Sequence, residues 1–129
     1  VELRKGDHLY INDGTYGNLF DAGFLHFIFP VKLWRPNGQH SDNIVPFSFY
    51  GPTCDSLDYM KGPFYLPEDV QEGDYIEIGQ LGAYGRTLAT NFNGFRAEEE
   101  VVCVTDEPIM TMYGENAPKN DESFEVIAA

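Results

Sequence analysis

Basic residues, cysteines and long apolar runs are all scarce in this sequence of 129 residues. Lysine and arginine together number 8 against 21 acidic residues, which leaves a formal net charge of -13. Such a chain repels phosphate backbones and anionic lipid headgroups, so neither nucleic acid nor a membrane surface is expected as a partner. The acidity suits a cationic ligand, but an excess of carboxylates also simply keeps a protein in solution.

No stretch approaches the roughly 20 apolar residues that a membrane-spanning helix needs. The first residues also lack the charged and then apolar layout of a signal peptide, so a cytoplasmic protein is expected. We expect Cys54 and Cys103 to be free thiols, because a chain of this size does not depend on a disulfide for its core. Residues 1–4 read like the end of a strand already under way, and Val1 is not an initiator methionine, so a fragment of a longer protein is expected.

Two common kinds of ligand site have no clear signature. His8, His26 and His40 are scattered without the spacing of metal ligands, so no metal site is expected. The glycines at positions 79, 82 and 85 do not match the dinucleotide fingerprint, and no convincing helix follows them. We interpret these glycines as a tight connection.

Aromatic and β-branched runs of strand length alternate with clusters of glycine, proline, asparagine and aspartate. The pattern predicts strands at residues 8–12, 24–34, 44–50, 75–78 and 101–105, with a break or bulge at Pro30 because proline cannot donate a ladder hydrogen bond. It predicts an all-β domain, a Greek-key barrel or sandwich, over residues 1–112. A loosely held polar tail is expected over residues 113–129.

The segment Gly51-Pro-Thr-Cys-Asp-Ser-Leu-Asp58 places a thiol and a carboxylate side by side in a loop between two β segments. Loops held by a rigid scaffold often carry function. Taken alone, the same residues also fit a buried small cysteine beside a turn-forming aspartate. The loop by itself leaves both interpretations open.

This loop closely resembles the corresponding loop of eukaryotic-type ornithine decarboxylases, in the superfamily of ornithine, diaminopimelate and arginine decarboxylases with the alanine-racemase-like fold type. Two further blocks agree in order and approximate spacing, namely residues 10–17 upstream and residues 66–95 downstream, including Gly82-Ala-Tyr-Gly85 and Phe92-Asn-Gly-Phe95. In diaminopimelate decarboxylases the loop looks like Cys-Glu-Ser, whereas here it is Cys54-Asp55-Ser56. This departure favours a substrate with a simple distal amine, such as ornithine or lysine.

The resemblance implies a two-domain subunit in which an α/β-barrel holds pyridoxal 5'-phosphate (PLP) on a lysine and a C-terminal β-domain follows. The barrel is absent from this chain. The resemblance further implies a homodimer with shared active sites, acting in polyamine biosynthesis. By position, Cys54 would be the catalytic proton donor, Asp55 the contact to the distal ammonium of the substrate, and Tyr84 a contact to the cofactor phosphate. Tyr16 and Phe92 match aromatic residues that stack near the interface.

The chemistry suits these residue types. PLP delocalises the carbanion that remains after carbon dioxide departs, so the protein has to orient the substrate and manage one proton. A thiol is mainly protonated at neutral pH and is still acidic enough to donate that proton. An adjacent carboxylate supplies a fixed charge for the far end of a basic amino acid.

One departure leaves the substrate open. The family often has a Tyr-Asp pair in the segment that corresponds to residues 24–29, and this chain has no acid there. Asp21 is the nearest candidate and does not align cleanly. Two alternatives to a decarboxylase domain also stay open, namely a non-catalytic homologue that acts as a regulatory binding protein and an unrelated ligand-binding β-barrel.

Overall fold

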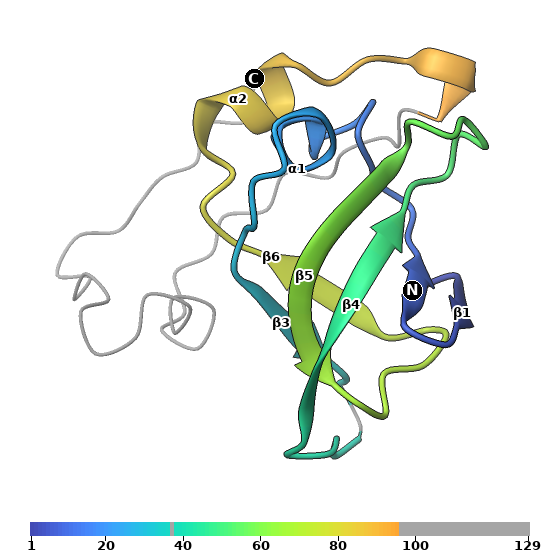
Figure 1. Cartoon of the computed structure of the whole chain (residues 1–129), viewed down its shortest axis with the longest axis vertical. Helices are drawn as coiled ribbons and strands as arrows, with labels where there is room; N and C mark the ends of the chain where they lie inside the picture. The colour runs from blue at the N-terminus through green and yellow to red at the C-terminus, as the bar shows by residue number, and fades with distance from the viewer. Residues whose placement is uncertain (37, 96–129) are drawn as a thin grey trace, which may run out of the picture. The chain divides into compact units, whose positions relative to one another are not determined.

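The structure, a computed structural model, describes residues 1–36 and 38–95 (Figure 1). Its elements in chain order are β1 (Leu3–Lys5), β2 (His8–Tyr10), α1 (Phe20–Phe24), β3 (Val31–Trp34), β4 (Ile44–Tyr50), β5 (Tyr59–Pro67), β6 (Tyr75–Ile78), α2 (Gly82–Thr87) and the 3-10 turn η1 (Phe92–Gly94). Strands therefore dominate the described part of the chain, and the prediction of a β-domain is confirmed.

The strands form two sheets. The first has the order β1-β2-β4-β5, in which β2 runs parallel to β4 and the other neighbours are antiparallel. The second is the antiparallel pair of β3 and β6, with Val31 opposite Ile78. In Figure 1 the long strands β4 and β5 cross this pair. The described strands do not close into a barrel, so the arrangement corresponds to the sandwich form of the prediction.

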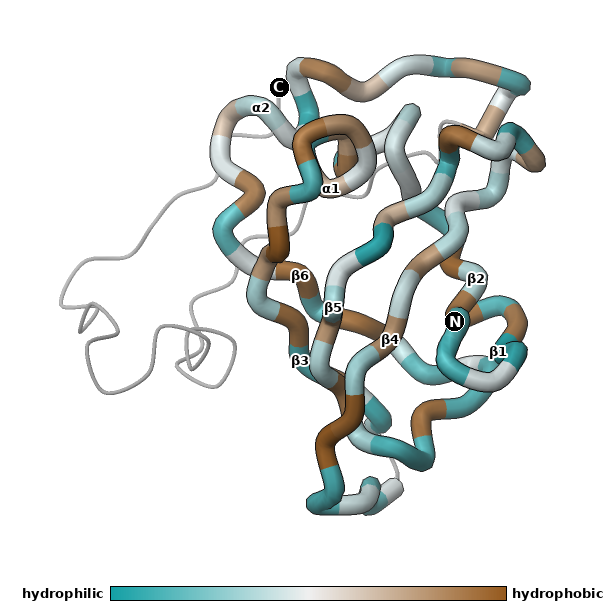
Figure 2. Tube along the Cα trace, viewed as in Figure 1, coloured by the Kyte–Doolittle hydropathy of each residue, from teal (hydrophilic) through white to brown (hydrophobic). Residues whose placement is uncertain are grey.

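The core lies on one face of the larger sheet. Along β4 the side chains of Phe47 and Phe49 are buried, whereas the intervening Ser48 is only half-buried, as expected when successive side chains point to opposite faces. Phe49 stacks on Phe64 of β5 with a centroid separation of 4.2 Å. Figure 2 shows the corresponding alternation of apolar and polar residues along the chain. This packed face fixes the ends of β4 and β5 and the loop between them.

The predicted strand over residues 24–34 is wrong in its first part. Phe24 instead ends the helix α1, and regular strand structure begins only at Val31. The carbonyl of Asp21 accepts hydrogen bonds from the backbone N–H groups of Leu25 and Phe27, and His26 between them has a φ of 57°. A largely apolar run cannot reveal such a turn, because apolar residues suit a helix end and a strand equally.

Three further expectations need comment. The longest described strand, β5, was not predicted, because Gly62 and Pro63 inside it resemble a strand breaker. The tight connection expected around Gly82 is instead the helix α2. The strand predicted at residues 101–105, Cys103 and the tail at 113–129 lie outside the described residues, as does the predicted domain end at 112.

Candidate active-site loop

The loop between β4 and β5 is fixed by the buried side chain of Asp58, which is 1% exposed. One carboxylate oxygen accepts a hydrogen bond from the backbone N–H of Thr15 at 2.8 Å. The other accepts two from Thr53, from the backbone N–H at 3.0 Å and from the hydroxyl at 2.7 Å. The N–H of Gly51 closes the loop by donating to the carbonyl of Asp58 at 2.9 Å. Both ends of the loop are thereby attached to the segment that contains Thr15.

Two glycines make room for this carboxylate. A Cβ atom at Gly14 would lie 2.2 Å from an oxygen of Asp58, and one at Gly51 would lie 2.1 Å from the same oxygen. Any larger residue at either position would therefore push Asp58 out of its place. Sequence reasoning assigned no role to Asp58, because only the tertiary structure shows that a loop aspartate is buried.

Cys54 projects from this fixed loop. Its side chain is exposed and its thiol is free, with the sulfur 3.9 Å from the carbonyl oxygen of Pro52. Its backbone has a φ of 61°, which is uncommon for a residue with a side chain. The interpretation of a small buried cysteine is therefore wrong. The loop presents a thiol to the outside at a strained, well-fixed position, and such strain is frequent at functional sites.

Asp55 follows Cys54 and is half-buried. One of its carboxylate oxygens accepts a hydrogen bond from the backbone N–H of Leu57 at 2.8 Å. Burial raises the pKa of the nearby Tyr16 phenol, and the negative charge of Asp55 raises it further. The phenol therefore stays protonated across the neutral range.

Tyr16 stacks on Phe92, as the family resemblance implied, with ring centroids 4.4 Å apart. The hollow beside the pair has a volume of only about 10 Å³, and neither Cys54 nor Asp55 lines it.

Tyr84 lies on the helix α2, where its ring is 67% exposed, rather than in the glycine-flanked loop that the sequence suggested. Helix α2 lies close to the chain near Asn18, because a Cβ at Gly85 would be in ordinary van der Waals contact, at 3.5 Å, with the carbonyl oxygen of Asn18. Figure 1 shows α2 at the same end of the molecule as the loop between β4 and β5. The Tyr84 hydroxyl is accessible to a ligand approaching that end.

Among the described residues Tyr84 is a candidate contact for PLP, whereas the lysines are not. Lys5, Lys32 and Lys61 are exposed side chains on strands, which is not the enclosed setting of a Schiff-base lysine. The exposed Tyr84 hydroxyl can donate to a phosphate oxygen. Among the described residues no group of three or more histidine, cysteine or acidic side chains is arranged to hold a metal ion. No helix in the described ranges is long and apolar enough to cross a membrane.

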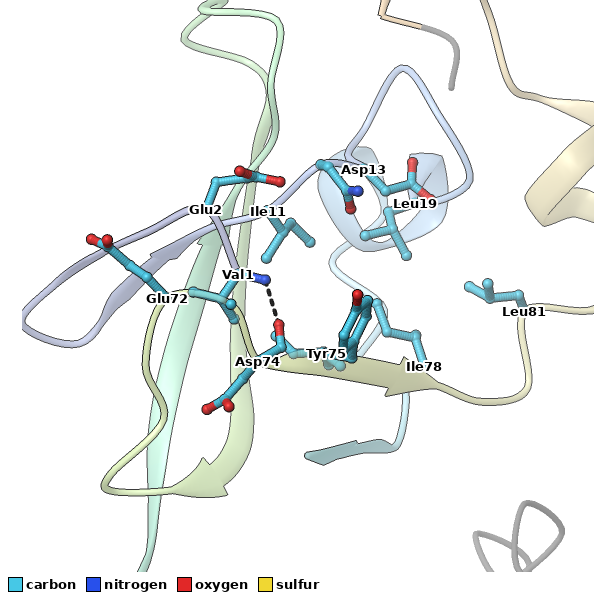
Figure 3. Close-up of a pocket in the computed structure, with 13 residues that line it drawn as sticks. Val1, Glu2, Ile11, Asp13, Leu19, Glu72, Asp74, Tyr75, Ile78 and Leu81 are labelled. Carbon is cyan, nitrogen blue, oxygen red and sulfur yellow. Dashed lines mark hydrogen bonds between the residues drawn. The ribbon is translucent and has the colours of Figure 1, made fainter. Parts of the chain in front are cut away.

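A separate hollow of about 540 Å³ lies between the first residues of the chain and β6 (Figure 3). Ile11, Leu19 and Ile78 line it, together with acidic side chains such as Glu72. The amino group of Val1 donates a hydrogen bond of 2.6 Å to the carbonyl oxygen of Asp74 at its edge. Neither Cys54 nor Asp55 lines this hollow, so it is not part of the candidate site.

Comparison with known families assigns this domain. The model of the C-terminal sheet domain of pyridoxal-dependent decarboxylases matches residues 1–82, and the chain belongs to this family. Ornithine decarboxylase of Neurospora crassa is 32% identical over 111 residues, covering 78% of this chain and 23% of that protein. Antizyme inhibitor 2 of Xenopus laevis is 34% identical over 95 residues, covering 74% of this chain and 20% of that protein.

Similarity to solved structures agrees with this family membership. Arginine decarboxylase of Paramecium bursaria Chlorella virus, bound to agmatine, superposes with a TM-score of 0.58 at 32% identity, over 73% of this chain and 25% of that one. Lysine/ornithine decarboxylase of Vibrio vulnificus, complexed with cadaverine, gives a TM-score of 0.55 at 32% identity, with the same two coverages. The chain thus spans about a quarter of the length of these proteins. Family membership rules out the alternative of an unrelated β-barrel.

Proposed function

We propose that this domain completes the active site of a PLP-dependent decarboxylase that converts ornithine, or lysine, to a diamine in cytoplasmic polyamine biosynthesis. In this proposal Cys54 donates the proton that finishes the reaction and Asp55 binds the distal ammonium of the substrate. The observation that carries the proposal is the exposed thiol of Cys54 next to the Asp55 carboxylate, on a loop that Asp58 fixes.

Cys54 is suited to deliver one proton to the substrate carbon. PLP, when bound, takes up the electrons that carbon dioxide leaves behind. The sulfur of Cys54 then holds the proton that the substrate carbon must receive. Its positive φ points the side chain out of the loop, and the hydrogen bonds of Asp58 to Thr53 keep the preceding residue in place. A fixed acid determines which atom is protonated, because proton transfer needs hydrogen-bond reach.

Asp55 is suited to recognise a charged chain end. One of its carboxylate oxygens accepts from the Leu57 N–H, and its remaining lone pairs can accept from an ammonium group. Related structures contain agmatine and cadaverine, which are both cationic amines. A charge-assisted hydrogen bond of this kind is about twice as strong as a neutral one.

The site on this chain is open, which is why we propose a homodimer with shared sites. Cys54 is exposed and Asp55 is half-buried at the surface of the described residues, so a partner surface would be needed to enclose a substrate against them. In this arrangement Tyr84 contacts the cofactor phosphate, and the pair of Tyr16 and Phe92 lies at the interface. Mixing full-length Cys54→Ala subunits with subunits that lack the Schiff-base lysine should restore up to about a quarter of wild-type activity if dimers form statistically. Absence of any recovery, with mixed dimers demonstrated by mass spectrometry, contradicts the sharing of sites.

A regulatory homologue without activity is the second candidate, and the similarity to antizyme inhibitor 2 favours it. The retention of both Cys54 and Asp55 in a fixed, accessible loop counts against it. The full-length protein that carries this domain distinguishes the two. Absence of turnover on ornithine, lysine and arginine, with PLP bound, would select the regulatory homologue.

The proposed role of Asp55 has its own test in the full-length protein. Asp55→Ala should lower kcat/KM for ornithine and lysine by an amount equivalent to about 2–5 kcal/mol, because the substrate ammonium loses its charged partner. Norvaline, which resembles ornithine without the distal amine, should be affected far less. Equal losses for ornithine and norvaline would show that Asp55 only supports the loop.

A further inference from the structure

Thr53, the residue before Cys54, is 4% exposed and has all of its polar groups engaged. Its backbone N–H and its hydroxyl donate to the Asp58 carboxylate, at 3.0 and 2.7 Å. Its carbonyl oxygen accepts a hydrogen bond of 3.0 Å from the side-chain amide of Asn93. Asp58 belongs to the same loop as Thr53. Asn93 therefore holds this residue from a segment that is far away in the sequence.

Asn93 approaches the loop from a defined position, because its own segment is anchored at Tyr16. The backbone N–H and the hydroxyl of Thr90 both donate to the carbonyl oxygen of Tyr16, at 2.7 and 3.0 Å. The N–H of Phe92 donates to the Thr90 hydroxyl at 3.2 Å, and the Phe92 ring stacks on Tyr16. Asn93 follows with a φ of 54°, a left-handed backbone that glycine and asparagine adopt more readily than other residues.

The carbonyl that Asn93 contacts belongs to the peptide group that joins Thr53 to Cys54. A peptide group is planar, so a contact that holds its oxygen also fixes the direction of the N–Cα bond of Cys54. The φ of 61° at Cys54 is the rotation about that bond, and it directs the side chain out of the loop. A rotation of the peptide plane would therefore carry the sulfur atom with it.

We propose that Asn93 is a positioning residue for the proton donor, whose side-chain amide holds the peptide plane before Cys54 so that the thiol is directed at the substrate carbon. This inference rests on the proposed function of Cys54. A displacement of about 1 Å at a reacting group can cost as much as about 10²-fold in rate. Asp55 has a separate hydrogen bond, from the Leu57 N–H at 2.8 Å, so loss of the Asn93 contact should affect proton delivery more than substrate binding.

Two substitutions in the full-length protein remove the amide donor and keep the backbone. Asn93→Gly retains a residue that tolerates positive φ. Asn93→Asp retains the shape of the side chain, but its carboxylate is ionised at neutral pH and cannot donate to the Thr53 carbonyl. For both we expect kcat on ornithine to fall by about 3–10-fold, as one hydrogen bond is lost, with KM changed by less than about 2-fold.

The products distinguish positioning from a merely structural role. A proton that reaches the cofactor in place of the substrate carbon leads, after hydrolysis by water, to an aldehyde and pyridoxamine phosphate. The aldehyde share should therefore rise in Asn93→Gly and in Asn93→Asp. Asn43→Gly is the matched control, because it removes an amide that donates to Glu68 at 2.8 Å, next to the opposite end of β4 from the loop. Its aldehyde share should equal that of the wild type.

A double-mutant comparison completes the test. In a Cys54→Ala background, Asn93→Gly should raise the aldehyde share no further, because the thiol that it positions is already gone. A wild-type product ratio in either Asn93 variant, with that of Cys54→Ala shifted, overturns this inference and leaves the proposed function intact. A further rise in the double mutant also overturns it. If Cys54→Ala itself leaves turnover and product ratio unchanged, the proposed function fails and this inference fails with it.

Discussion

Asp58→Asn is the substitution that most directly examines how the active-site loop is fixed. The Asp58 side chain is 1% exposed and accepts three hydrogen bonds, one from Thr15 and two from Thr53. An asparagine amide can replace one carboxylate oxygen but presents N–H donors where the other accepted. The backbone N–H of Thr53 then faces a donor and loses its partner.

The magnitude follows from these contacts. A hydrogen bond to a charged group contributes about 1.5–3 kcal/mol, and a buried donor left without a partner costs a similar amount. We therefore expect Asp58→Asn to reduce the free energy of unfolding by about 2–4 kcal/mol. The exposed Asp42 provides the matched control, because Asp42→Asn removes the same charge from an open part of the surface.

The assay combines stability with the chemistry of the thiol. Thermal unfolding of the chain should show a Tm lower by roughly 10 °C for Asp58→Asn and nearly unchanged for Asp42→Asn. Peptide mapping of alkylation should show a changed rate at Cys54, because the loop that holds its positive φ is released. A Tm within about 2 °C of the wild type, with an unchanged alkylation rate at Cys54, would refute the role given to Asp58.

Two further predictions concern other parts of the chain. The hydrogen bonds of Arg35 lower the pKa of the Asp74 carboxyl, although burial opposes this shift. The ionised carboxylate therefore stabilises the fold at pH values above the ordinary pKa of an aspartate. This stabilisation is lost as the pH falls through the lowered pKa. Acidification from pH 7 to 3 should therefore reduce the free energy of unfolding of the wild type more than that of Asp74→Asn, as measured by urea denaturation. Equal reductions for the two proteins would contradict the pairing of Arg35 with Asp74. The isolated chain should decarboxylate neither ornithine nor lysine in the presence of PLP, because Lys5, Lys32 and Lys61 are exposed and lack the enclosed setting of a Schiff-base lysine; a borohydride-stable adduct together with significant turnover would contradict this.

Sequence reasoning was successful where local pattern and structure coincide. The strands at residues 44–50 and 75–78 were predicted within their observed bounds, because their apolar side chains follow a period of two or form a short run between turns. The motif blocks also identified the loop of Cys54 and Asp55 and the aromatic pair of Tyr16 and Phe92. These features are carried by short segments whose order is visible in the chain.

Other features depend on contacts between distant segments. The burial of Asp58 requires Gly14 and Gly51 to meet around it, and no local pattern indicates that meeting. The hydrogen bond from the side-chain amide of Asn93 to the carbonyl of Thr53 likewise joins segments that are far apart in the sequence. Pro63 within β5 misled the strand prediction, because the rule against proline in strands describes central positions in regular ladders.

The central claim is that Cys54 donates the proton that completes decarboxylation. Without a positioned acid, the proton would be added to the cofactor in place of the substrate carbon, and hydrolysis by water would then release an aldehyde and leave the amino group on the cofactor as pyridoxamine phosphate. The deciding measurement is the ratio of amine to aldehyde formed from ornithine by the full-length Cys54→Ala enzyme, together with its turnover. We expect turnover to fall by about 10²–10⁴-fold and the aldehyde share to rise, while Cys103→Ala changes neither. An unchanged product ratio at near wild-type turnover for Cys54→Ala would contradict the claim.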